Sequence, residues 1–324
     1  MKCNISQDVT AAAELLHNGE LVAFATETVY GLGANALNPE AVARIFEVKQ
    51  RPHFDPLIVH IAAPEQLSEF TTGLSAPAQR LAERFWPGPL TLVLPKRNVI
   101  PDLVTSGLDS VAIRIPAHPI ARELLQITGL PIAAPSANKF GCLSPTLAQH
   151  VVEQLGDEIP MILEGGPCQV GVESTVIQCT EESTILLRPG GIALEEIESC
   201  VETVRLARIE DFAETKSQVS PGMLPRHYAP GTRLFLIEKL EQLPSAESIG
   251  VLSLYPIEET ILSGREFAVQ EILSPSGDLK TAAAKLFSAL RNLDQSGVEC
   301  IVALKMPETG LGRTINNRLE RAAY

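Results

Sequence analysis

Most side chains in this sequence that could do chemistry are cations, hydroxyls and amides close to the ends of apolar runs. Arg114 lies within SVAIRIP, and Arg188 ends TILLRPGG directly before a proline. Two arginines beside loops suit a phosphate or a carboxylate, because a guanidinium donates paired hydrogen bonds to an oxyanion. Each arginine alone fits a solvated face equally well. Together they favour a site for anions.

Polar residues also follow the apolar run LPIAA. The segment APSANKFGCLSPT offers Ser136, Asn138 and Ser144 in a turn rich in proline and glycine, and GVESTVIQ offers Ser174 at the start of another strand. Turn formation alone would account for these residues. A cluster of hydroxyls and amides at the end of a strand is also how open α/β sheets hold ligands. The sequence leaves both interpretations open.

Lys49, Arg51 and His60 are further candidates. KQRP places both cations at the end of a helix that begins at Asn38, where the alternative is a helix C-terminus with solvated side chains. His60 lies in the apolar strand PLIVHIA, where the alternative is a hydrogen-bonded core histidine. No Ser-His-Asp, Cys-His or paired-carboxylate arrangement stands out. The residues therefore favour binding and neutralising anions over a nucleophilic side chain.

The stretch GLGANA, residues 31–36, matches the pattern G-x-G-x-x-A of dinucleotide-binding proteins. Its glycines are not expected to open a helix, because the next helix is predicted to begin only at Asn38 and Pro39. The sequence also lacks a Walker motif. Any ATP is therefore expected to be bound by other means.

The composition limits the class of protein. The chain has 324 residues, 45% of them hydrophobic, and a formal net charge of −13. The length favours two domains, and the charge argues against a broad basic face for nucleic acid. The N-terminus lacks the apolar run of a signal peptide, so a cytoplasmic protein without membrane contact is expected. The six cysteines have the spacing of neither a zinc site nor a disulfide framework and are expected to be reduced.

Alternating strand and helix patterns predict an α/β protein with a large twisted mixed sheet and flanking helices, followed by a small Rossmann-like α/β/α domain. The turn CTEEST predicts an antiparallel hairpin. The expected division is a first domain at 1–205, a connector at 206–231 and a second domain at 232–324. In the first domain, strands are expected near 21–25, 90–94, 110–115, 131–134, 161–164, 173–179 and 184–188, and helices near 8–18, 39–50, 76–85, 118–127 and 146–155.

A series of ordered blocks resembles the YrdC-type domain of the L-threonylcarbamoyl-AMP synthase family. The blocks are ATETVYGLG, KQRP with PLIVHI, SVAIRIP, PSAN with SPT, VESTVI and LLRPGG. The segment SPGMLPRHYAP and the ending GRTINNRLERAA are similar to the long, two-domain branch of that family. The resemblance covers essentially the whole chain.

The resemblance implies a nucleotidyltransferase that combines L-threonine, bicarbonate and ATP into threonylcarbamoyl-AMP and pyrophosphate. Mg²⁺ would bridge phosphate oxygens, with no organic cofactor and no metal site of the protein's own. The product would be the first intermediate of threonylcarbamoyladenosine in certain tRNAs and would pass to downstream threonylcarbamoyl-transfer proteins. Contact with tRNA itself is expected to be weak or indirect.

The resemblance also implies roles for individual residues. Lys49 and Arg51 look like the catalytic cations that grip ATP phosphates. Asp55 stands where the family usually has asparagine, which places an acid where a neutral amide would lie near phosphates. The implied threonine pocket is Thr28, His60, Arg114, Ser174 and the backbone of Ala134, and the implied ATP contacts are Lys49, Arg51, Asp55, Ser110, Ser136, Asn138, Ser144, Arg188, His227 and Tyr228.

The segment SPGMLPRHYAP, residues 220–230, contains three prolines and is predicted to be stiff and extended. A plain spacer has no need of Arg226, His227 and Tyr228 side by side, and Pro225 stands where the family has a bulkier side chain. We expect this segment to fold over the mouth of the first domain's cavity, with Tyr228 and His227 closing on the nucleotide.

Two other functions are compatible with parts of the sequence. One is a non-catalytic RNA-binding module, against which the acidic composition counts. The other is a carbamoyl-adenylate-forming enzyme that uses carbamoyl phosphate, as in hydrogenase-maturation proteins with a similar domain. Those proteins resemble much longer chains with zinc-finger cysteine pairs, which this sequence lacks.

Overall fold

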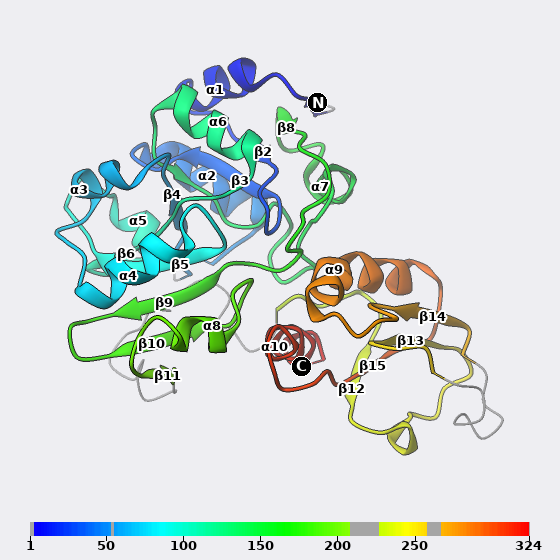
Figure 1. Cartoon of the computed structure of the whole chain (residues 1–324). Coiled ribbons are helices and arrows are strands. Elements are labelled where there is room, and N and C mark those ends of the chain that lie inside the picture. The colour runs from blue at the N-terminus through cyan, green and yellow to red at the C-terminus, as the bar shows by residue number, and fades with distance from the viewer. Residues whose placement is uncertain (1–2, 53–54, 208–226, 258–266, 324) are drawn as a thin grey trace.

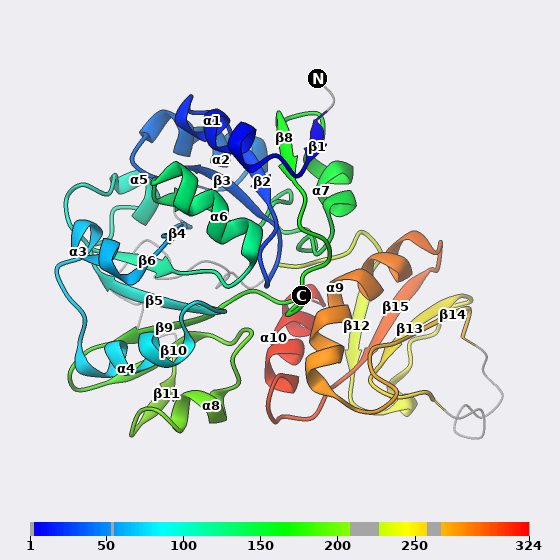
Figure 2. The ribbon, with the colours of Figure 1, turned by 45° about the horizontal axis from the view of Figure 1, so that its top comes forward.

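The computed structural model describes residues 3–52, 55–207, 227–257 and 267–323. Within them an eleven-stranded sheet forms an N-terminal unit and a four-stranded sheet forms a C-terminal unit (Figures 1 and 2). Of the predicted connector, residues 208–226 lie outside the described residues, whereas residues 206–207 and 227–231 lie within them. None of the described helices is long and apolar enough to cross a bilayer.

The large sheet is mixed, as predicted, and has the order β1-β8-β2-β3-β7-β4-β6-β5-β9-β10-β11. The predicted hairpin is confirmed, because β9 and β10 pair antiparallel. In contrast, β4 and β6 run parallel, and this register places His60 beside Arg114. The strands are β1 (Asn4–Ser6), β2 (Val22–Phe24), β3 (Gly31–Asn35), β4 (Ile58–His60), β5 (Leu90–Pro95), β6 (Ser110–Arg114), β7 (Ile132–Ala133), β8 (Met161–Leu163), β9 (Thr175–Cys179), β10 (Thr184–Arg188) and β11 (Val204–Leu206).

Helices cover both faces of this sheet. Alternate strand residues point to opposite faces, so Phe24 packs with α1 and α6, while Leu32 packs in the core that includes α2, α4 and α7. The predicted helices are all present. The helices are α1 (Val9–His17), α2 (Pro39–Lys49), α3 (Leu67–Phe70), α4 (Ala76–Phe85), α5 (Asp102–Thr105), α6 (Pro119–Thr128), α7 (Ala148–Leu155) and α8 (Leu194–Glu198), with a 3-10 turn η1 (Pro64–Gln66).

The glycine-rich stretch at residues 31–36 contains a strand, β3, that the sequence did not indicate. It confirms that these glycines do not open a helix, since α2 begins at Pro39. Gly33 leaves no room for a side chain, because a Cβ there would lie 2.8 Å from the Phe24 ring and 2.9 Å from Ile132. The glycine therefore serves close strand packing rather than phosphate binding.

Helix α2 carries the first candidate cations. Its start is fixed by Asn38, whose side chain accepts hydrogen bonds from the backbone N–H groups of Glu40 and Ala41. Its end is fixed by Gln50, which adopts the left-handed conformation at φ 54°. Lys49 is thus the last helical residue, and Arg51 leaves the helix in a new direction.

The C-terminal unit is a parallel sheet in the order β12-β15-β13-β14. Within the described residues, α9 and α10 both pack on one face of this sheet; residues 258–266, in the connection from β13 to β14, lie outside the described residues. Ile301 and Ala303 of β15 point toward these helices, while Cys300 and Val302 pack with loop and strand residues on the other face. The elements are β12 (Leu234–Ile237), η3 (Leu240–Gln242), β13 (Ile249–Ser253), β14 (Val269–Ile272), α9 (Leu279–Gln295), β15 (Cys300–Leu304) and α10 (Gly312–Ala322).

Helices α9 and α10 lie between the two sheets (Figure 2). Arg291 of α9 donates to the carbonyl oxygen of Leu143 at 2.6 Å, and Thr314 of α10 donates to that of Gly190 at 2.9 Å. A Cβ on Gly171 would lie 2.4 Å from the Cα of Ala284 in α9. The C-terminal unit is therefore packed tightly against loops of the N-terminal unit.

Candidate active site

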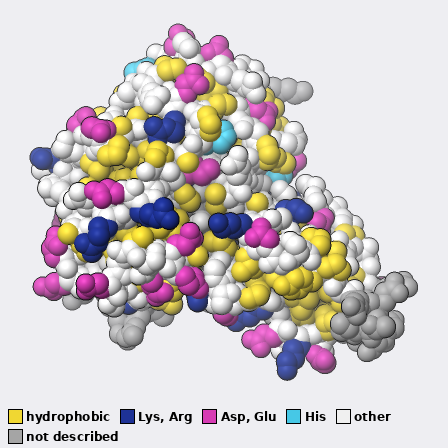
Figure 3. All heavy atoms as spheres, in the orientation of Figure 1, with side chains coloured by type: hydrophobic (Ala, Val, Ile, Leu, Met, Phe, Trp, Pro, Cys, Tyr) yellow, Lys and Arg dark blue, Asp and Glu magenta, His cyan; other side chains and the backbone are white. Residues whose placement is uncertain are grey.

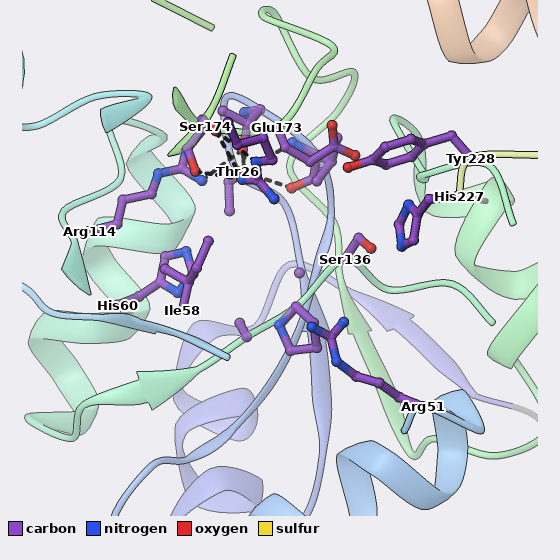
Figure 4. Close-up of a pocket in the computed structure, with 16 residues that line it drawn as sticks. Thr26, Arg51, Ile58, His60, Arg114, Ser136, Glu173, Ser174, His227 and Tyr228 are labelled. Atoms are coloured by element: carbon purple, nitrogen blue, oxygen red, sulfur yellow. Dashed lines mark hydrogen bonds between the residues drawn. The ribbon is translucent and has the colours of Figure 1, made fainter. Parts of the chain in front are cut away.

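A cavity in the N-terminal unit gathers residues that are far apart in the sequence. In Figure 4, His60 and Arg114 lie on one side of it, His227 and Tyr228 lie on the opposite side, and Arg51 lies below. The free volume is about 50 Å³, so the cavity is closed in this conformation compared with the roughly 300–1,000 Å³ of typical small-molecule sites. The lining residues are Thr26, Thr28, Val29, Gly31, Arg51, Ile58, His60, Arg114, Ala134, Pro135, Ser136, Glu173, Ser174, Arg188, His227 and Tyr228.

Arg114 ends β6 and is only 4% exposed, so the alternative of a solvated face is wrong. Its guanidinium donates from Nη1 to Thr28 Oγ1 at 2.8 Å and from Nη2 to Glu27 Oε1 at 2.6 Å. A third, longer hydrogen bond runs from Nε to the carbonyl oxygen of Gly88. A guanidinium has five N–H donors. Within the part of the chain that the structure describes, two of them have no acceptor.

Arg188 ends β10, where the register with β9 shifts between Leu186 and Arg188. Its Nη2 donates to the carbonyl oxygen of Ser174 at 2.9 Å and to Ser174 Oγ at 3.2 Å. Ser174 Oγ also shares a 2.7 Å hydrogen bond with Thr91. The hairpin predicted from the sequence therefore brings Ser174 and Arg188 together at the cavity wall.

Arg51 lines the cavity from below and is held by its own loop. Its Nε donates to the carbonyl oxygen of Asp55 at 3.1 Å, and its Nη2 donates to that of Pro56 at 2.9 Å. The carboxylate of Asp55 forms an ion pair with Nη2 at 2.8 Å and is fully buried. Asp55 does not line the cavity. It acts on this site through Arg51.

Lys49 does not line the cavity and is buried behind it, with 1% of its surface exposed. The alternative of a solvated helix end is wrong here too. Its Nζ donates to the carbonyl oxygens of Ser136 and Asn138, both at 2.5 Å. Burial and the nearby Arg51 lower the pKa of Lys49 well below its usual value. Lys49 thus supports the loop that carries Ser136 instead of facing the cavity.

Three other predicted ATP contacts lie outside the lining. Asn138 shapes the turn after β7, since its side-chain amide donates to the carbonyl oxygens of Lys139 and Cys142. Ser144 is fully buried and donates to Glu173 Oε1 at 2.5 Å. Ser110 begins β6, at the end of the strand opposite Arg114. The structure therefore brings ten of the predicted residues into one cavity and keeps Lys49, Asp55, Ser110, Asn138 and Ser144 out of its wall.

The described end of the connector closes the cavity. Tyr228 is 1% exposed and adopts φ 60°, a backbone conformation uncommon for a residue other than glycine. The N–H of His227 donates to the carbonyl oxygen of Arg321 in α10, and the N–H of Ala229 donates to that of Gly141. The connector is therefore anchored to both units at the position where it covers the site.

Comparisons with known proteins agree with this arrangement. The Sua5, YciO and YrdC family model, described as "Telomere recombination", matches residues 14–190, and a model described as "Threonylcarbamoyl-AMP synthase, C-terminal domain" matches residues 192–324. A threonylcarbamoyl-AMP synthase of Pyrococcus abyssi is 44% identical over 328 residues, which span 97% of this chain and 94% of the relative. The chain belongs to the Sua5/YrdC threonylcarbamoyl-AMP synthase family.

Other members of the family are similar over the same length. A threonylcarbamoyl-AMP synthase of Bacillus subtilis is 44% identical over 331 residues, covering 97% of this chain and 92% of the relative. The crystal structure of P. abyssi Sua5 complexed with L-threonine matches with a TM-score of 0.87 and 43% identity, over 97% of this chain and 94% of that one. The predicted fold class of the N-terminal unit and the family are thus confirmed.

Two histidines of this Sua5/YrdC site are neutral at physiological pH. Burial, aided by the charge of Arg114, lowers the pKa of His60 to about 3. Burial also lowers the pKa of His227 to about 3, an effect that Glu173 opposes and that the charges of Arg51, Lys49 and Arg318 reinforce. The Nδ1 atoms of both rings make no hydrogen bond within the described residues. Both uncharged imidazole rings can therefore form hydrogen bonds with a ligand without adding positive charge to a site that already contains several arginines.

The site also contains two buried carboxylates that sequence reasoning missed. Glu27 pairs with Arg114, and Glu173 pairs with Arg318 of α10 at 2.7 Å. Burial raises the pKa of Glu173, but Arg318 and Arg188 outweigh that effect and hold it below its usual value. Both acids stood inside the family-like blocks ATETVYGLG and VESTVI, next to predicted site residues. Their position next to predicted site residues was the one feature of the sequence that could have identified them.

Proposed function

We propose that this chain catalyses the formation of L-threonylcarbamoyl-AMP and pyrophosphate from L-threonine, bicarbonate and ATP. The observation that carries the proposal is the convergence of Arg114 with Arg51 and Arg188 on a single closed cavity, in a chain that matches the family over its full length. All three reactants are anions or carry a carboxylate. Buried cations that face each other are what such a reaction requires.

We assign the threonine to the side of the cavity formed by Arg114, His60 and Thr28. The two unused N–H groups of Arg114 suit the amino acid's carboxylate. Neutral His60 accepts a hydrogen bond from the ammonium or hydroxyl group. Ser174 and the backbone of Ala134 complete this side. Threonine placed here points its amine toward the middle of the cavity.

We assign the nucleotide to the opposite side, where Arg51, Arg188 and Ser136 face the connector. Guanidinium groups at this side neutralise the phosphates. The described residues contain no group of His, Cys, Asp or Glu suited to hold a metal ion. We propose that Mg²⁺ enters with ATP on its phosphate oxygens, which matches its preference for phosphates and water over an all-protein site.

The reaction then follows from placement. The threonine amine adds to CO₂ from bicarbonate, which loses water, and the resulting carbamate carries a new negative charge. A carbamate oxygen attacks the α-phosphorus of ATP, and the bond to the β-phosphate oxygen breaks to release pyrophosphate. Holding the two anions in line supplies most of the rate enhancement. The buried arginines stabilise the charge that builds up between them.

We propose that the connector opens to admit ATP and closes again with His227 and Tyr228 against the nucleotide. The cavity of about 50 Å³ is too small for ATP in its present conformation, so entry requires movement. Closure excludes water from the acyl-adenylate. The product would pass to downstream tRNA threonylcarbamoyl-transfer proteins in the cytoplasm. On the face shown in Figure 3, Lys and Arg side chains are interspersed with Asp and Glu, which favours a weak or indirect contact with tRNA.

Pyrophosphate release with ATP, Mg²⁺ and bicarbonate tests this function. We expect release to depend on threonine and to be much slower with serine. Arg114→Gln should abolish threonine-dependent pyrophosphate release. The matched control Arg97→Gln changes an arginine outside the cavity and should retain it. Release that depends on carbamoyl phosphate instead would favour the carbamoyl-adenylate reaction. Salt-sensitive tRNA binding without any ATP consumption would favour the RNA-binding alternative.

A further inference from the structure

Thr26 lines the cavity beside Thr28 but was not among the predicted site residues (Figure 4). It lies in the connection from β2 to β3 and is 2% exposed. Its hydroxyl donates to the carbonyl oxygen of Val29 at 2.6 Å, and its Oγ1 accepts from the backbone N–H groups of Thr28 and Val29, both at 3.2 Å. The side chain of Thr26 therefore closes the turn that carries Thr28.

The hydrogen bond between the two threonine hydroxyls has only one possible direction. The Oγ1 atoms of Thr26 and Thr28 lie 2.8 Å apart. A hydroxyl group has a single hydrogen to donate, and Thr26 donates its hydrogen to the carbonyl oxygen of Val29. Thr28 must therefore donate to Thr26. The hydrogen bonds run from Thr28 through Thr26 to the backbone of Val29.

Thr28 is consequently left as an acceptor only. Its side chain is fully buried, and its Oγ1 accepts a hydrogen bond from Arg114 Nη1 at 2.8 Å. A hydroxyl oxygen has two acceptor positions. Within the part of the chain that the structure describes, one of them is used by Arg114 and the other has no donor. A ligand can therefore donate a hydrogen bond to Thr28, whereas Thr28 has no hydrogen to give to a carboxylate.

An acceptor directly beside Arg114 matches the chemistry of an α-amino acid. The α-ammonium group and the carboxylate are bonded to the same carbon atom, and an ammonium group can only donate hydrogen bonds. With the carboxylate on Arg114, the ammonium group is the nearest donor for Thr28, and such a charge-assisted hydrogen bond is strong. If the hydroxyl hydrogen of Thr28 pointed into the cavity instead, it would face the ammonium hydrogens and disfavour binding.

We propose that Thr26 is a positioning residue for L-threonine: by accepting the hydroxyl hydrogen of Thr28, it fixes Thr28 as an acceptor for the substrate's ammonium group. The donor and acceptor positions of Thr26 are used within its own turn, so it acts through Thr28 and not on the ligand. This inference rests on the proposed function. It deepens that function, because the amine held in this way is the group that adds to CO₂.

The test is the Kd of L-threonine by titration calorimetry, together with the KM for ATP in pyrophosphate release. Thr26→Val keeps the shape of the side chain but removes the hydroxyl. It should raise the Kd of L-threonine by about tenfold and change the KM for ATP by less than about twofold. Thr26→Ser restores the hydroxyl and should keep the Kd within about threefold of the unsubstituted chain.

Thr180→Val is the matched control. Thr180 closes the turn between β9 and β10 in the same way, since it accepts from the N–H of Ser183 at 3.0 Å and donates to the carbonyl oxygen of Ser183 at 3.4 Å. It lies outside the cavity. Its replacement should leave both constants unchanged.

A double variant separates positioning from a general loss of structure. In a chain that already carries Thr28→Val, adding Thr26→Val should raise the Kd of L-threonine by less than about twofold more, because the hydroxyl that Thr26 orients is gone. A further tenfold loss in that background would overturn the proposal. So would a Thr26→Ser chain that binds L-threonine as weakly as Thr26→Val.

The outcomes also distinguish this inference from the proposed function. An unsubstituted chain that does not bind L-threonine refutes both. A chain with threonine-dependent pyrophosphate release whose Thr26→Val variant keeps its Kd refutes the inference alone. If Thr26→Val does not fold, a crystal structure of the unsubstituted chain with L-threonine decides. The ammonium nitrogen within hydrogen-bond distance of Thr28 Oγ1 supports the proposal, and a carboxylate oxygen in that position refutes it.

Discussion

Replacing Lys49 with methionine tests the finding that this cation supports the site from behind. Methionine keeps most of the apolar stem but removes the ammonium, so the carbonyl oxygens of Ser136 and Asn138 lose their 2.5 Å donor. A hydrogen bond to a charged group contributes about 1.5–3 kcal/mol, and relief from burying the charge offsets part of two such losses. We therefore expect the free energy of unfolding to fall by about 2–4 kcal/mol, a large share of a typical 5–15 kcal/mol.

Urea unfolding followed by the fluorescence of the single tryptophan, Trp86, measures this loss. Activity should fall in parallel, because the loop that carries Ser136 loses its support. Lys285→Met, on an exposed position of α9, is the matched control and should change stability by less than about 0.5 kcal/mol. A Lys49→Met protein of unchanged stability whose kcat falls more than about 100-fold would contradict a supporting role for Lys49, because the ammonium would then act on the reactants directly.

Four further predictions concern the cavity. His60 and His227 have pKa values of about 3 in the folded chain but near 6.5 in the unfolded chain, so the unfolded chain binds more protons below pH 6.5. Each histidine should therefore lower the free energy of unfolding by about 2 kcal/mol as the pH falls from 8 to 5. Urea unfolding of His60→Asn should show a smaller loss than the unsubstituted chain, and an identical pH dependence would contradict this. Asp55→Asn should free Arg51 for phosphate and lower the KM for ATP by about threefold while also lowering Tm, and a raised KM would count against the role of this ion pair. Arg114→Lys should raise the KM for threonine by about tenfold or more and leave that for ATP within about twofold, so equal effects on both would place threonine elsewhere. Replacing both His227 and Tyr228 by alanine should weaken the use of ATP while the N-terminal unit stays folded, as circular dichroism and kinetics would show; unchanged kinetics would remove the lid.

The fold was predictable where apolar runs had the period of a strand or a helix. Strands β6 and β10 and helix α2 follow directly from such runs and from the Asn38 cap. Strand β3 was not predicted, because glycine does not favour strands; here the glycines leave room for the Phe24 side chain of a neighbouring strand. The short strands β1, β11 and β14 were also missed, and each lies at the edge of its sheet. Edge strands have little burial to impose a pattern on their sequence.

The site was predictable to the extent that its residues lie within recognisable blocks. Arg114, Ser174 and Arg188 were found in this way. The inward position of Lys49 was not, because it depends on the left-handed turn at Gln50 and on a loop 87 residues further along the chain. The contact between Arg318 and Glu173 spans 145 residues and two units. A single sequence carries no signal for a pairing of that kind.

A crystal structure with L-threonine and a non-hydrolysable ATP analogue bound together tests the central claim most directly. We expect the connector to be closed over an enlarged cavity, with the threonine carboxylate on Arg114, the phosphates between Arg51 and Arg188, and Tyr228 against the nucleotide. Clear density for either ligand away from these arginines, for example in the groove beside Trp86, would contradict it.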